Sequence, residues 1–113
     1  MTLSDFQALT GAKLLTPSAD VRREITCGYC CDLLSWVMSH GAAGMAWMTV
    51  QTHMNVVAVA TLMDMAAVIA PEGIHFEADV IAKADEEGIA LFESDKTAYA
   101  LSGLLFGAGV PAN

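Results

Sequence analysis

Basic residues are scarce in this chain of 113 residues. Five Lys and Arg stand against thirteen Asp and Glu, which gives a formal net charge of -8, and eight of the acids lie between Glu72 and Asp95. Such a balance repels the phosphate backbone of nucleic acids and the headgroups of anionic lipids. We therefore expect neither nucleic-acid binding nor membrane-surface binding.

Targeting and membrane-spanning signals are also missing. The first residues lack a basic stretch followed by an unbroken apolar run, so they do not resemble a secretory signal. The longest apolar tract, Met54 to Ala70, is interrupted by Asn55, Thr61 and Asp64, and it divides better into a helix and a strand than into a membrane span. The sequence predicts a cytoplasmic protein with no transmembrane segment.

Two common catalytic motifs do not occur. There is no Gly-x-x-x-x-Gly-Lys-Ser/Thr phosphate loop and no Gly-x-Ser-x-Gly nucleophile elbow. The sequence therefore favours a non-enzymatic role without a cofactor, and it identifies no catalytic residue.

Cysteine is represented by Cys27, Cys30 and Cys31, which contain one C-x-x-C spacing and no second pair. This spacing can bind zinc or iron if His40 or His53 completes the ligand set, so a cysteine-based metal or redox sensor is an alternative function. A cytoplasmic cysteine more often behaves as a small buried apolar residue. The preferred interpretation is that no metal site exists.

The size and composition of the chain predict one domain, residues 1–113, with a substantial core. Apolar residues make up 55% of the chain and charged residues only 16%, which is more apolar than an average globular protein. Methionine and tryptophan are concentrated in the central third of the sequence. We expect part of this apolar surface to contact a second copy in a homodimer.

Apolar runs and turn residues alternate along the chain in a β-α order. We expect strands at 25–30, 46–50, 67–70 and 89–92, and helices at 4–9, 33–40, 56–63, 77–87 and 98–105. Three helix caps are predicted: Asp32, then Asn55 or Thr52, then Ser94 or Asp95. The alternation predicts the α/β class, with a largely parallel sheet that helices cover on both faces.

Polar residues interrupt the apolar stretch from Met48 to Val59. Because ligands of open parallel sheets bind beyond the carboxyl ends of the strands, these residues and the preceding junction are candidates for one shared pocket. A simple capping role is the alternative interpretation. The predicted ligand-binding residues are Gln51, Thr52, His53 and Asn55, with Gly28, Tyr29 and Asp32 from the preceding junction and Glu72 and Gly73 as the far wall.

Several stretches together resemble the DRTGG domain family over about Ile25 to Val110. They are Cys27-Gly28-Tyr29, Asp32-Leu33-Leu34-Ser35, Trp47-x-Thr49-Val50-Gln51-Thr52-His53-x-Asn55-Val56, Ala82-Lys83-Ala84-x-Glu86-Glu87-Gly88-Ile89 and Thr97-Ala98-Tyr99. The literal Asp-Arg-Thr-Gly-Gly string is absent, and only Thr26-Cys27-Gly28 lies near its expected place.

Members of this family resemble the non-catalytic N-terminal domain of HPr kinase/phosphorylase and also accompany CBS domains in pyrophosphatases. The resemblance implies a three-layer α/β/α sandwich with a mainly parallel sheet of about five strands. It also implies a regulatory domain with a sensing or assembly role that packs as a homodimer. From the residues of the candidate pocket we expect it to bind a small polar or anionic metabolite, and we expect it to influence a partner enzyme or kinase. A third possibility from the residues alone is a small hydrolase or transferase that uses Asp32, His53 and Asn55.

Overall fold

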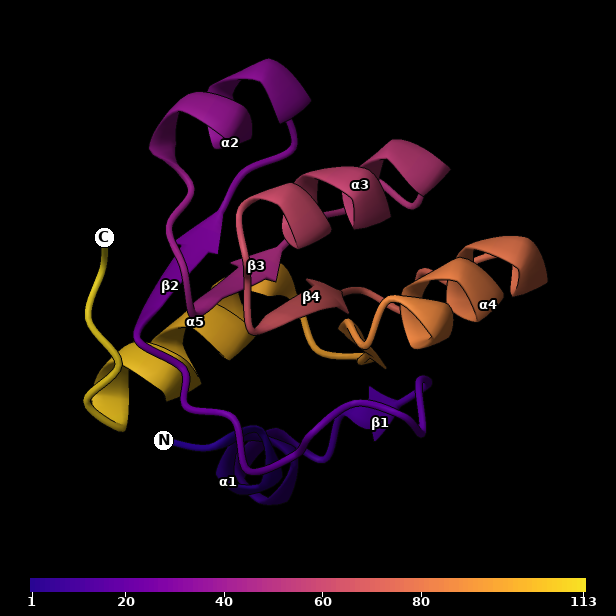
Figure 1. The fold of residues 1–113 in the computed structure, drawn as a ribbon. Helices are drawn as coiled ribbons and strands as arrows, with labels where there is room; N and C mark the ends of the chain where they lie inside the picture. The colour runs from indigo at the N-terminus through magenta and orange to yellow at the C-terminus, as the bar shows by residue number, and fades with distance from the viewer.

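The computed structural model describes all 113 residues and contains one five-stranded sheet with five helices (Figure 1). The strands are β1 (Lys13–Leu14), β2 (Cys27–Cys30), β3 (Met45–Met48), β4 (Ala67–Ala70) and β5 (Ala90–Glu93). The helices are α1 (Leu3–Thr10), α2 (Leu34–His40), α3 (Met54–Leu62), α4 (Ala78–Glu86) and α5 (Ala98–Gly107). The strand order is β1-β5-β4-β3-β2, in which β2 to β5 are parallel and β1 is antiparallel to β5.

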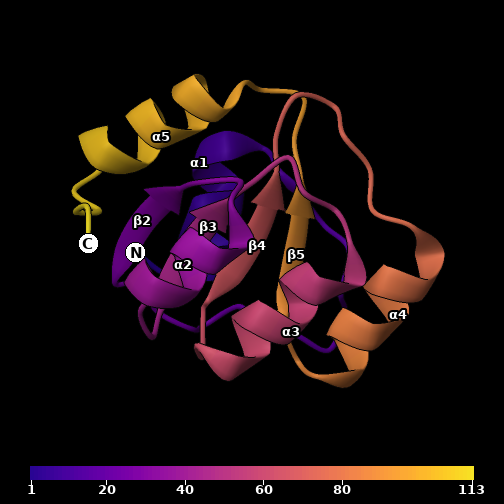
Figure 2. The same ribbon diagram turned by 90° about the horizontal axis from the view of Figure 1, so that it is seen from above.

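The helices cover both faces of the sheet, as Figure 2 shows from above. Helices α2, α3 and α4 lie on one face, and α1 and α5 lie on the other. Along β3, Met45 and Trp47 belong to the apolar cluster under the first face, whereas Ala46 and Met48 belong to the cluster under the second. This alternation is the period of two expected for a strand between two covered faces. The predicted α/β class and three-layer sandwich are confirmed.

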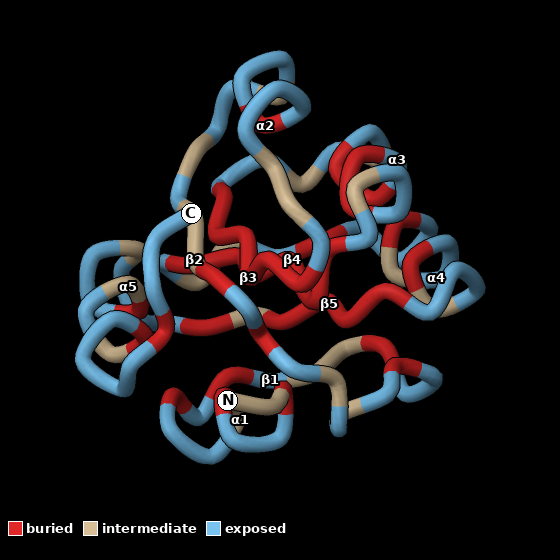
Figure 3. Tube along the Cα trace, turned by 60° about the vertical axis from the view of Figure 1, so that its left-hand side comes forward, coloured by how far each residue is buried: buried red, intermediate tan, exposed pale blue.

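Strands β3 and β4 are buried along their whole length (Figure 3). The strand predicted at 67–70 has the observed bounds of β4, and the other three predicted strands differ by one or two residues at their ends. The Trp47 side chain is fully buried in β3, and its indole N–H donates to the Cys31 carbonyl oxygen at 2.8 Å. Burial on both faces explains why these strands are recognisable as short apolar runs in the sequence.

The predicted caps of α2 and α3 are wrong. Leu33 occupies the N-cap position of α2 and makes no side-chain hydrogen bond there. The Asp32 carboxylate does not cap the helix, because it accepts hydrogen bonds from Thr49 and Val50 in the loop after β3. His53, not Asn55 or Thr52, caps α3, and its Nδ1 accepts the Asn55 backbone N–H at 3.1 Å.

The predicted cap of α5 is also wrong. Thr97 is the N-cap, and its hydroxyl oxygen accepts the Ala100 backbone N–H at 3.1 Å. Ser94 lies too early in the chain for this role, since its hydroxyl accepts the Lys96 backbone N–H within the loop that precedes the helix. The Asp95 side chain makes no cap hydrogen bond.

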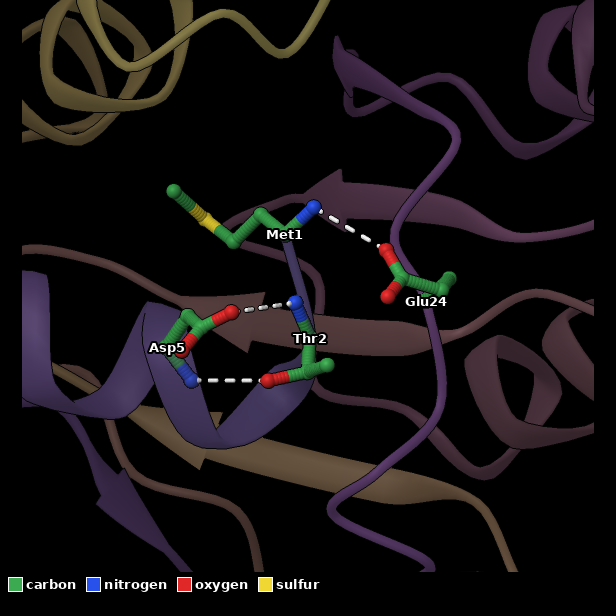
Figure 4. Close-up of polar contacts among 4 residues, drawn as sticks. All are labelled: Met1, Thr2, Asp5 and Glu24. Carbon is green, nitrogen blue, oxygen red and sulfur yellow. Dashed lines mark hydrogen bonds and ion pairs between the residues drawn. The ribbon is translucent and has the colours of Figure 1, made fainter.

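Helix α1 is fixed at both of its ends. Thr2 and Asp5 form a capping box with two hydrogen bonds of 3.0 Å, and the Met1 ammonium pairs with Glu24 at 3.0 Å (Figure 4). The hydrogen bonds from Thr2 hold the pKa of the Asp5 carboxyl below its usual value. Gly11 ends the helix with a φ of 72°, a left-handed conformation that favours glycine. The chain then enters β1, a strand that the sequence did not predict.

None of the helices is both long and apolar enough to cross a membrane.

Candidate functional site

The loops that follow β2, β3, β4 and β5 leave the sheet at the same edge, because these strands are parallel. Most of the predicted ligand-binding residues lie in these loops, and Gly28 and Tyr29 lie within β2. The carboxyl edge of a parallel sheet is the usual ligand position in this class of fold.

Asp32 joins the first two loops. Its Oδ1 accepts the Thr49 hydroxyl at 2.9 Å and the Val50 backbone N–H at 2.9 Å. The Thr49 hydroxyl oxygen in turn accepts the Gln51 backbone N–H at 3.1 Å. Hydrogen bonds to a carboxylate are stronger than those between neutral groups. Asp32 thus sets the conformation of the loop that carries Gln51, Thr52 and His53.

That loop forms one wall of a hollow of about 410 Å³, which we call the β3–α3 hollow. It is lined by Val50, Gln51, Thr52, His53 and Met54, and on the side of α4 by Glu77, Asp79 and Val80. The Gln51 and His53 side chains are exposed and that of Thr52 is partly exposed. These three predicted residues are therefore brought together at one accessible surface.

The polar groups of the β3–α3 hollow favour a neutral or cationic ligand over an anion. His53 accepts a hydrogen bond at Nδ1, so in the neutral imidazole the proton lies on Nε2, which is a donor. Glu77 and Asp79 add two carboxyl groups to the opposite wall. The helix-terminal amides of Asn55 and Val56 already donate to the His53 side chain and carbonyl, respectively.

The remaining predicted residues lie elsewhere. Gly28 and Tyr29 line an apolar hollow of about 380 Å³ between β2 and α5. Tyr29 also packs against the apolar cluster on the other face of the sheet, and desolvation raises the pKa of its hydroxyl. Asn55 faces a hollow between α2 and α3. Gly73 lines a polar hollow beside β5, and Glu72 is exposed outside all of these hollows. One crevice does not unite the predicted set, because its members line hollows that lie between different elements.

The side chains proposed for the alternative functions, a hydrolase or transferase and a metal sensor, do not converge. Asp32 is engaged by Thr49 and Val50, and Asn55 and His53 line different hollows, so the three residues do not form a catalytic group. No group of three or more His, Cys, Asp or Glu side chains is arranged to hold a metal ion.

The cysteines differ among themselves in exposure. Cys27 is buried, Cys31 is partly buried and Cys30 is exposed, and none forms a disulfide. Desolvation and, to a smaller extent, the neighbouring Asp32 and Cys31 raise the pKa of the Cys30 thiol, which opposes the thiolate that metal binding and redox chemistry require.

Sequence reasoning missed the charged residues of the polar hollow beside β5, namely Lys13, His75, Glu93, Asp95 and Lys96. Lys13 reaches this place only because β1 pairs with β5, opposite Glu93. A two-residue strand carries no periodic signal, so only a search for basic residues in an acidic chain would have singled out Lys13 and Lys96.

No protein-family model matches the chain, and no curated protein matches its sequence. Among solved structures, the chain is similar to the CBS and DRTGG domains of the regulatory region of Clostridium perfringens pyrophosphatase, in complex with the activator diadenosine tetraphosphate. The TM-score is 0.71 at 10% sequence identity, and the match covers 92% of this chain and 45% of that chain. This chain therefore has a fold that is present in that regulatory region, and it spans less than half of that region's length.

Proposed function

We propose that this chain is a DRTGG-like regulatory domain that senses a small polar metabolite in the β3–α3 hollow and has no catalytic activity of its own. The observation that carries the proposal is the conformation of the loop between β3 and α3. Asp32 holds Thr49 and Val50 of this loop by hydrogen bonds, and Gln51, Thr52 and His53 line one hollow. The DRTGG-like motifs in the sequence and the fold shared with a pyrophosphatase regulatory region support a regulatory role.

The charge of the β3–α3 hollow narrows the ligand class. Glu77 and Asp79 oppose an anionic ligand, and the chain as a whole carries a formal charge of -8. A neutral or singly cationic ligand with hydroxyl or amide groups would instead match the Gln51 amide, the Thr52 hydroxyl and the His53 Nε2–H. We therefore expect a different ligand class from the tetraphosphate activator of the pyrophosphatase region.

The test is a titration of the purified chain with a metabolite library, read by thermal shift and then by calorimetry. Gln51→Ala and Thr52→Ala should each weaken binding of a hit by about 5- to 10-fold, as expected for the loss of one hydrogen bond. Asn55→Ala is the control, because this side chain faces the hollow on the other side of α3. A hit whose affinity neither Gln51→Ala nor Thr52→Ala changes would place the ligand site elsewhere, and turnover of a hit would contradict the non-catalytic role.

The homodimer belongs to the same proposal, with α2 at its centre. Most of this helix is exposed (Figure 3), and it buries only Val37. Leu33, Trp36 and Met38 are 50–62% exposed, and Leu62 of α3 is 71% exposed. No Asp, Glu, Lys or Arg lies between Leu33 and Gly41. Because two copies with a charge of -8 repel each other, a contact through α2, which carries no carboxylate, has a lower electrostatic cost than one through the acidic surface of α4.

The oligomeric state tests this surface. A specific dimer buries at least roughly 1,000 Å² in total, and Trp36→Glu should convert it into a monomer. Leu9→Glu is the matched control, since Leu9 on α1 is 39% exposed on the opposite face of the sheet from α2. Light scattering that finds only the 11.9 kDa monomer at high concentration would refute the dimer. The cytoplasmic location and the regulation of a partner enzyme or kinase complete the proposal.

A further inference from the structure

Two of the five basic side chains have no acidic partner, and both line the same hollow. Arg22, Arg23 and Lys83 form ion pairs of 2.9–3.0 Å with Asp20, Asp64 and Glu87, respectively. No carboxylate oxygen lies within 4.0 Å of the ammonium nitrogen of Lys13 or Lys96. Acidic side chains greatly outnumber basic ones in this chain, so two unpaired lysines in one place need an explanation.

The hollow that they share, which we call the β5 hollow, has a volume of about 360 Å³ and no apolar residue in its lining. Its walls come from three segments that are distant in sequence: 10–13, 73–75 and 93–96. Backbone hydrogen bonds hold these segments together, from Gly73 N–H to the Ser94 carbonyl at 2.9 Å and from Glu72 N–H to the Lys96 carbonyl at 2.8 Å. The β1–β5 ladder places Lys13 opposite Glu93. The walls are thus fixed by the fold rather than by the side chains that line them.

The acidic groups of the β5 hollow have different roles. Glu93 is occupied, because one carboxylate oxygen pairs with His75 Nδ1 at 3.0 Å and the other accepts the Phe76 N–H at 3.0 Å. Asp95 forms no ion pair, and its side chain accepts no hydrogen bond from the protein. Two ammonium groups and one carboxylate therefore remain available to a ligand.

We propose that the β5 hollow binds a small zwitterion of the α-amino-acid class. Its carboxylate would lie between Lys13 and Lys96, and its ammonium group would face Asp95. A polyphosphate would bring more negative charge than two lysines neutralise beside Asp95 and Glu93, whereas a zwitterion matches both signs. The volume of about 360 Å³ lies at the lower end of the range for small-molecule sites, about 300–1,000 Å³. This site is separate from the β3–α3 hollow, so each proposal can fail without the other.

The test is a titration of the ¹⁵N-labelled full chain with each standard L-amino acid, followed by NMR. Acetate and methylammonium serve as probes that carry only one of the two charges. We expect one amino acid or a related group to shift the amide signals of Lys13, Gly73 and Lys96, with binding at least about tenfold tighter than that of either single-charge probe.

The variants Lys13→Gln, Lys96→Gln and Asp95→Asn should each weaken this binding about tenfold or more. Lys83→Gln is the matched control, because Lys83 pairs with Glu87 on α4 and lies outside the hollow. Gln51→Ala should also have no effect, which separates this site from the β3–α3 hollow. The proposal is overturned if no amino acid shifts these amides, if acetate binds as tightly as the best amino acid, or if the three variants bind like the wild type.

Discussion

The two ends of the sheet present opposite kinds of surface. Beside β2, helix α2 exposes Leu33, Trp36 and Met38 and carries no Asp, Glu, Lys or Arg. Beside β5 and β1, the β5 hollow has no apolar residue and contains both unpaired lysines. Three of the exposed large apolar side chains thus lie together at one end of the sheet, and the two unpaired lysines lie at the other. The proposed homodimer contact and the proposed amino-acid site therefore lie at opposite ends of the sheet.

The two outer strands of the parallel part of the sheet, β5 and β2, are also protected differently. An exposed edge offers unpaired backbone groups to another chain. The edge of β5 is covered by β1, which pairs with it through Lys13 and Leu14. The edge of β2 is covered only in part, by the hydrogen bond from Gly28 N–H to the Pro111 carbonyl at 2.9 Å and by a single bridge to Ala112. The partly covered edge of β2 thus lies at the same end of the sheet as the exposed apolar side chains of α2, through which the homodimer is proposed.

The largest expected effect is a loss of stability when a tryptophan of the buried core is replaced, compared with replacement of a tryptophan on the apolar surface at the β2 end. Trp47→Ala removes a fully buried indole and its hydrogen bond to Cys31, so it should lower the free energy of unfolding by about 3–5 kcal/mol. Trp36→Ala removes a side chain that is about half exposed, and it should change the unfolding of the monomer by less than about 1 kcal/mol. Urea denaturation at low protein concentration measures both. Equal losses for the two variants would mean that α2 is part of the core.

An intermediate effect distinguishes the carboxylates of the two ends. Asp32→Ala leaves the buried Thr49 hydroxyl and the Val50 N–H without their acceptor, so it should cost about 1–3 kcal/mol. Asp95→Ala removes a carboxylate without a protein partner and should cost less than about 0.5 kcal/mol. Urea denaturation again gives both values. A larger cost for Asp95→Ala than for Asp32→Ala would contradict the assignment of Asp95 as a group kept free for a ligand.

The smallest expected effect is a pH dependence of stability that comes from the Arg23–Asp64 ion pair, which lies at neither end of the sheet. The Arg23 guanidinium donates to Asp64 at 2.9 Å and holds the pKa of this carboxyl below its usual value of 3.8. Because the pKa is lower in the folded state, the contribution is fully present above about pH 4 and is lost as the pH falls through the folded pKa. Asp64→Asn should therefore flatten the stability curve slightly below pH 4 and leave its slope unchanged between pH 6 and 8. An unaltered acid limb would show that the exposed pair contributes nothing measurable.

Much of the fold was predictable because the buried strands and the bodies of the helices carry local signals. The run Ala67-Val68-Ile69-Ala70 is apolar throughout and ends at Pro71, so its bounds were predicted as observed. The helix caps were not, since a cap depends on which neighbouring group captures each polar side chain. Asp32 is the clearest example: the sequence predicts it as the cap of α2, but it lies one residue before the N-cap, and Thr49 and Val50 in the loop after β3 engage its carboxylate.

The candidate site shows the same division. The grouping of Gln51, Thr52 and His53 follows from their adjacency in one strand-to-helix loop, so the sequence by itself brought them together. Only the tertiary structure separated Gly28, Asn55 and Gly73 from them, because side-chain packing divides one sheet edge into several hollows.

The sequence by itself determined the acidic charge, the β-α alternation and hence the parallel sheet with helices on both faces, because these depend on composition and on short-range periodicity. Only the tertiary structure decided that Lys13 and Lys96 share a hollow. These residues are distant in sequence and meet because β1 pairs with β5, and this pairing depends on long-range backbone hydrogen bonds that leave no pattern in two residues.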